Sequence, residues 1–106
     1  MNKKIEQISE HYGYDPQSRQ LIEEMAELTK ALNKFWRKNL HCGEIKLTPE
    51  LVERLKQTKE YTDILEETAD VHIMIMQITH LLQLDIMPMI DFKLQRQCKR
   101  IEKEGF

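Results

Sequence analysis

The sequence predicts an all-α fold, a four-helix bundle that assembles as a homo-oligomer, and three observations support this prediction. The 106 residues include only three glycines and three prolines, so few residues interrupt a helix. Apolar residues recur at helical spacing and do not alternate with the period of two typical of strands. The stretch "VHIMIMQITHLL" (71–82) is apolar almost all round, as in helices that are buried on every side. The other helices of so short a chain cover only part of it, so we expect a second subunit across a symmetric interface.

The first half of a single domain, residues 1–106, is expected to form two helices. A short helix over 2–12 ends where Gly13 can adopt a left-handed conformation. A second helix over 16–38 begins after Asp15, a suitable N-cap, with a proline at its first position. Its apolar residues recur at steps of four and three: Leu21, Met25, Leu28, Leu32 and Phe35.

The second half is expected to form a connector and two further helices. The connector spans 39–48, and a long helix over 49–84 follows, with Thr48 as its N-cap. The polar "KQTKEYT" in this helix predicts a kink or break near 57–61. A last helix spans 86–104, with Asp85 as the expected cap and Gly105 after its end.

Charge and composition exclude several classes of protein. The 16 basic residues are balanced by 18 acidic ones, so no basic field exists to hold a nucleic acid. No apolar run approaches the roughly 20 residues of a membrane span, and the first residues do not resemble a signal peptide. Cys42 and Cys98 form no metal or disulfide pattern. We therefore expect a cytoplasmic protein with neither nucleic acid nor membrane as its partner.

Two pairs of carboxylates are the candidate site. Glu24 and Glu27 lie three apart in "LIEEMAEL", and Glu67 and Asp70 repeat this spacing in "LEETADV". Such pairs share one helix face and repel each other, and both pairs border apolar stripes, where unpaired charge is costly. Mg²⁺ takes carboxylate oxygens as ligands and keeps waters that phosphate oxygens can replace. A magnesium site is one interpretation; solvated helix faces are the other, since charged side chains are mostly exposed.

A carboxylate-bridged di-iron site is excluded by the spacing of the histidines. That site requires Glu-x-x-His on two helices, and no glutamate of this sequence has a histidine three residues later. His72 follows Asp70 by two residues, and His80 has Gln77, not a glutamate, three residues before it. We assign no catalytic role to any histidine.

The two acidic motifs resemble a known family. Glu24-x-x-Glu27 within "LIEEMAELTKAL" and Glu67-x-x-Asp70 within "ILEETADVHIMIMQI" are similar to the paired ExxE and ExxD motifs of the MazG-like nucleotide pyrophosphohydrolases. This all-α superfamily includes dimeric dUTPases and phosphoribosyl-ATP pyrophosphatases. The resemblance covers roughly residues 17 to 100. It implies a four-helix core built in homodimers or homotetramers, with Mg²⁺, or Mn²⁺ in its place, between the acidic helices.

The resemblance also implies an activity. Such enzymes cleave a nucleoside triphosphate between its α and β phosphates, giving a monophosphate and pyrophosphate, as in house-cleaning of the nucleotide pool. By this reading all four motif carboxylates are catalytic and bind metal: Glu24, Glu27, Glu67 and Asp70. The 39 residues between the two motifs exceed the usual family spacing, and Glu60-x-x-Asp63 would satisfy that spacing better. We prefer the later pair because of the apolar "ADVHIMIM" that accompanies it.

Further residues are candidates for contacts with the substrate. Lys93, Arg96 and Arg100 lie on one stretch of the last helix, where family members often place basic residues against phosphates; a solvated amphipathic face is the alternative. Trp36 and Gln20 are candidates for the nucleobase, although Trp36 is equally suited to an interface and Gln20 to the surface.

Two other functions stay open at this point. A non-catalytic helical interaction module would use the acidic stripes to bind basic partners or simply expose them to solvent. A phosphoribosyl-ATP pyrophosphatase belongs to the same superfamily and differs in its substrate. The sequence does not identify the preferred nucleotide.

Overall fold

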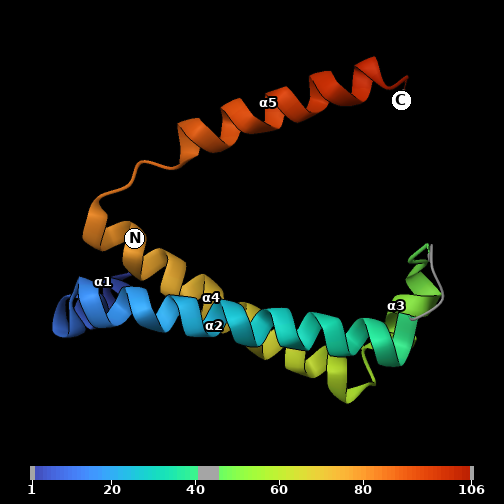
Figure 1. Cartoon of the computed structure of the whole chain (residues 1–106), viewed down its shortest axis with the longest axis horizontal. Coiled ribbons are helices and arrows are strands. Elements are labelled where there is room, and N and C mark those ends of the chain that lie inside the picture. The colour runs from blue at the N-terminus through green and yellow to red at the C-terminus, as the bar shows by residue number, and fades with distance from the viewer. Residues whose placement is uncertain (1, 41–45, 106) are drawn as a thin grey trace.

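Figure 1 shows a computed structural model of the chain, which describes residues 2–40 and 46–105. Over this part the fold is all-α, as predicted. It consists of five α-helices and a π-helical segment: α1 (Lys3–Tyr12), α2 (Tyr14–Phe35), η1 (Trp36–Leu40), α3 (Pro49–Leu55), α4 (Lys59–Leu82) and α5 (Met87–Lys103).

The centre of the molecule is the contact between α2 and α4, the most extensive between any two helices. The two helices run side by side in opposite directions (Figure 1), and α1 packs on both at one end. Helix α4 buries Val71, Met74 and Gln77 in this contact. Gln77 is only 2% exposed. The core therefore contains a polar side chain, although the sequence pattern predicted burial of the apolar residues around it.

The start of α2 differs from the expectation. Gly13, with a φ of 82°, ends α1 as predicted and is also the N-cap of α2. Only glycine adopts this backbone conformation at low cost, and it allows the second helix to begin at once. Asp15 is therefore not the N-cap. It lies in the first turn, where its carboxylate is 3.9 Å from the guanidinium of Arg19.

The expected long helix over 49–84 is two helices. The predicted Thr48 cap is confirmed, because its hydroxyl accepts a hydrogen bond from the amide of Leu51. Helix α3 ends at Leu55, and α4 begins at Lys59 with Thr58 as a second cap. The break thus lies at 56–58, at the beginning of the range predicted for it.

The ends of the other elements also shift. Helix α2 ends at Phe35, and η1 extends into the expected connector, of which 41–45 lie outside the described residues. Ile86, and not Asp85, is the N-cap of α5, without a side-chain hydrogen bond. Helix α4 ends at Leu82, and its C-cap Gln83 is in the left-handed conformation.

Helix α5 does not join the other helices. It stands apart from the α2–α4 pair in Figure 1, joined to it at one end, and all its residues are exposed. The expected four-helix bundle is therefore not closed within one chain, and its closure by further copies stays a prediction. None of the helices in the described ranges is long and apolar enough to cross a membrane.

Thr58 is expected to stabilise the fold through the start of α4. Its hydroxyl accepts from the amide of Tyr61 at 3.2 Å and donates to the carbonyl of Leu55 at 2.7 Å. Loss of an N-cap costs about 1 kcal/mol, so Thr58→Ala should lower the free energy of unfolding by about this amount in urea titrations. Thr58→Ser keeps the hydroxyl and should stay close to the wild type. Equal losses in both variants would show that the cap contributes nothing.

Candidate functional site

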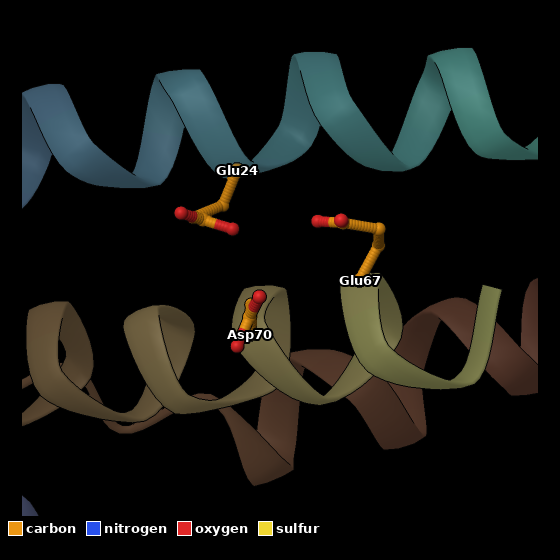
Figure 2. Close-up of side chains that lie close together, drawn as sticks. All are labelled: Glu24, Glu67 and Asp70. Atoms are coloured by element: carbon orange, nitrogen blue, oxygen red, sulfur yellow. The ribbon is translucent and has the colours of Figure 1, made fainter. Parts of the chain in front are cut away.

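Three of the predicted carboxylates converge between the two long helices. Glu24 extends from α2, and Glu67 and Asp70 extend toward it from α4 (Figure 2). One carboxylate oxygen from each residue lies within 4.8 Å of the other two. The two acidic motifs, some forty residues apart in the sequence, thus meet in one place.

The position of the cluster follows from helix geometry. Glu67 and Asp70 are three residues apart on α4 and so share a face, and they lie one turn from the buried Val71 and Met74. The apolar contact between α2 and α4 brings the carboxylates to the edge of the helix pair. Glu24 and Glu67 are half-buried there, and Asp70 is exposed.

The cluster is strongly negative. Partial burial raises the pKa of Glu67 above its ordinary value, and the charges of its neighbours raise it further, in decreasing order Asp70, Glu24, Glu27 and Glu66. These effects disfavour the charged form of Glu67. A cation between the helices would relieve the repulsion.

The hydrogen bonds of the cluster leave most of its oxygens free. The side-chain amide of Gln20 donates to Glu24 at 2.7 Å, which orients that carboxylate. Within the described part of the chain, Glu67 and Asp70 have no hydrogen-bond donor or basic partner. Carboxylate oxygens from two helices, close together and unpaired, fit the ligand preferences of Mg²⁺.

The alternative acidic pair is differently placed. Glu60 accepts a hydrogen bond from the side-chain amide of Asn39 at 3.2 Å, and Asp63 forms an ion pair with Lys59 at 3.1 Å. Each already has a partner. Glu67 and Asp70, not this pair, meet Glu24.

Two hollows of about 240 Å³ adjoin the cluster. Glu27 does not belong to the group of three but lines the first hollow with Glu67. The complete lining of the first is Glu27, Lys30, Ala31, Lys34, Asp63 and Glu67. The second is lined by Gln20, Glu24, Asp70, Ile73 and Met74. Basic side chains thus lie on one side of the carboxylates and apolar ones on the other.

Sequence reasoning missed some of these neighbours. Lys34 lies seven residues after Glu27, two turns along the same face of α2, and this spacing was the signal for it. Met74 was expected beside Glu67 and Asp70 as a core residue, but Ile73 was interpreted only as part of an apolar stretch, because its position beside the cluster depends on how α4 is rotated against α2.

Other predicted site residues lie away from the cluster in the single chain. Lys93, Arg96 and Arg100 are on α5, which makes no extensive contact with α2 or α4. Trp36 begins η1 and is 52% exposed; it lies twelve residues after Glu24, or about 18 Å along the helix axis. The roles suggested for these residues stay predictions. Gln20, by contrast, lines the second hollow.

Comparison with known proteins assigns no family to the chain. No protein-family model matches it, and neither a curated protein nor a solved structure matches it. The function of the chain is therefore inferred from its own residues.

The raised pKa of Glu67 predicts a pH dependence of stability. The folded chain holds a proton on Glu67 at pH values where the unfolded chain has lost it, so the free energy of unfolding should fall as the pH rises from about 4.5. Urea titrations in the presence of a chelator should show this fall in the wild type and a smaller one in Glu67→Gln. In Glu66→Gln, which keeps Glu67, the fall should persist. If the free energy of unfolding fell equally with pH in the wild type and in Glu67→Gln, the pKa of Glu67 would not be raised by its acidic neighbours.

Proposed function

We propose that this chain is a divalent-cation-dependent nucleoside triphosphate pyrophosphohydrolase of the MazG-like type. The observation that carries the proposal is the convergence of Glu24 with Glu67 and Asp70. These three residues belong to the two motifs on which the family resemblance depends. The proposed reaction is cleavage between the α and β phosphates, giving a nucleoside monophosphate and pyrophosphate.

The proposed ligands of Mg²⁺, or of Mn²⁺ in its place, are Glu24, Glu67 and Asp70. A bound divalent cation would neutralise phosphate charge and lower the pKa of a coordinated water. The hydrogen bond from Gln20 holds the Glu24 carboxylate toward α4, and such contacts to a ligand fix its orientation. Gln20 is thus proposed as a positioning residue.

Glu27 is proposed to accept a proton from the attacking water. It is the one motif carboxylate outside the group of three, and it lines the first hollow beside Glu67. A carboxylate that is not occupied by the cation is free to act as a general base. The family resemblance predicts Glu27 as a metal ligand, whereas this assignment makes it a general base. The effect of Mg²⁺ on the Tm of Glu27→Gln separates the two roles.

The two hollows suggest how a nucleotide would lie. Lys30 and Lys34 on the first side supply positive charge for phosphate oxygens. Ile73 and Met74 on the second side offer the apolar wall that a base requires. We therefore propose that the triphosphate lies toward the lysines, with the nucleoside toward Gln20 and the two apolar side chains.

The proposal includes assembly of the chain as a homodimer or homotetramer. Large apolar side chains are exposed on α2, α4 and α5, which supports burial against further copies. A phosphoribosyl-ATP pyrophosphatase would use the same cluster on a different substrate, and only a substrate assay separates the two enzymes.

Activity should depend on the carboxylates of the cluster. We expect purified protein with Mg²⁺ to release pyrophosphate from one or more nucleoside triphosphates, and Glu24→Gln and Asp70→Asn to lower the rate about 100-fold or more, because each removes charge that the cation needs. Glu66→Gln, on the same helix but outside the cluster, should retain activity. The proposal fails if orthophosphate is released instead, or if both variants remain fully active.

Metal binding should be visible without substrate. A ligand that binds only the folded state, present at 100 times its Kd, stabilises it by about 2.7 kcal/mol, so Mg²⁺ at that excess should raise the Tm of the wild type by roughly 10 °C or more. The rise should be absent in Asp70→Asn. Glu27→Gln should keep the rise but lose activity if Glu27 is the base, and lose both if it is a ligand. No effect of Mg²⁺ or Mn²⁺ on the wild type would favour a non-catalytic interaction module.

A further inference from the structure

Helix α5 is an amphipathic helix with nothing packed on its apolar side. All its residues are exposed, and it stands apart from the α2–α4 pair (Figure 1). Its apolar side chains recur at steps of three and four and form a stripe along the helix: Met87, Ile90, Leu94, Cys98 and Ile101. In proteins most helical stability comes from packing of such an apolar face rather than from helix propensity. The α5 stripe, defined by these five residues, therefore requires a partner.

A second apolar surface is uncovered on α4. The side chains concerned are between 40 and 62% exposed: Leu65, Ile73, Ile75, Met76 and Leu82. They are large apolar side chains of α4 that the chain leaves exposed, and Ile73 among them also lines the second hollow beside Glu24 and Asp70. We refer to these five residues as the α4 face.

The chain exposes more surface than a compact monomer of its mass, and the excess is as large as the interface of a stable dimer. The accessible surface is 8719 Å², whereas a compact monomer of 12.7 kDa is expected to expose roughly 6,200 Å². The radius of gyration is 17.5 Å, against about 13 Å for a compact chain of this length. The excess, roughly 2,500 Å² per chain, gives about 5,000 Å² for two chains, which is within the range of obligate homodimers.

Net charge favours contact of α5 with α4 over contact of α5 with a second α5, although Glu67 and Asp70 lie on the side of α4 toward α2. Helix α5 carries five basic and two acidic side chains. Helix α4 carries five acidic side chains and one basic one. Pairing of α5 with α4 is therefore favoured by charge, and pairing of α5 with another α5 is opposed.

The connection between the helices sets the direction of α5. Helix α4 closes with hydrogen bonds from the amide of Gln83 to the carbonyl of His80 at 3.2 Å and from the amide of Leu84 to the carbonyl of Thr79 at 3.0 Å. After this hydrogen-bonded cap the chain enters α5 away from the body (Figure 1). Helix α5 makes no extensive contact with the other helices of the described chain.

We infer that α5 of one copy packs its stripe on the α4 face of a second copy, and that the second copy returns its own α5 in the same way. Such reciprocal exchange gives a closed dimer with a two-fold axis. It explains both uncovered surfaces by one contact. The inference does not depend on the proposed nucleotide chemistry, and its test does not use activity.

The oligomeric state tests whether the stripe holds the copies together. Leu94 lies in the middle of the stripe, and Gln95 is the next residue, about 100° around the helix. In light scattering after size exclusion, the wild type and Gln95→Asp should have the mass of a dimer or a larger assembly. Leu94→Asp should have the mass of a monomer. A monomeric wild type, or Leu94→Asp with the mass of the wild type, would overturn the inference.

Photo-crosslinking of the full chain identifies the contact even if Leu94→Asp misfolds. A benzophenone side chain at position 94 is activated in a refolded mixture of ¹⁵N-labelled and unlabelled chains. Mixed-isotope links from position 94 to Lys59–Leu82 are expected, because they join α5 of one copy to α4 of another. If every link to α4 joined two segments with the same isotope, α5 would fold back on its own chain. Links to α5, or links that include no α4 residue, would show that the stripe packs on another partner. Each of these results contradicts the exchange.

Discussion

The rest of the structure depends on the antiparallel contact between α2 and α4. It is the most extensive contact between any two helices, and α4 buries Val71 and Met74. Apolar burial is the dominant favourable term in folding. The same contact brings Glu24 to Glu67 and Asp70. Packing energy therefore holds together carboxylates that repel one another. The candidate site is a place where the fold keeps like charges close, as is common where pKa values are perturbed for function.

Much of this arrangement was readable from the sequence. The apolar spacing predicted the all-α class and both acidic helices, and Thr48 and Gly13 were recognised as helix boundaries. Periodicity did not predict the start of α2, because Gly13 is the C-cap of one helix and the N-cap of the next. It also did not predict the N-cap at Thr58, because a threonine inside a polar stretch resembles any other surface residue. Rotation of one helix about another is a tertiary property, and so the place of Ile73 beside the cluster could not be read from spacing. The step of seven residues from Glu27 to Lys34 was a signal that the sequence did carry.

The sequence also predicted more burial than one chain provides. The stretch from Val71 to Leu82 is apolar on all sides, yet only Val71, Met74 and Gln77 are buried in it. The remaining apolar side chains on α4 and α5 are consistent with a fold completed by a second copy. In the proposed exchange, the basic residues of α5 reach the acidic helix of the partner, although they lie away from it in their own chain.

The central claim is that Glu24, Glu67 and Asp70 bind one divalent cation between α2 and α4. Anomalous diffraction from crystals grown with Mn²⁺ tests it most directly, because manganese scatters anomalously and replaces magnesium in oxygen-ligand sites. The account predicts an anomalous peak between the two helices, within coordination distance of an oxygen from each of the three carboxylates, and its loss in Asp70→Asn. Manganese bound only elsewhere on the surface, with the three carboxylates facing solvent alone, would contradict it.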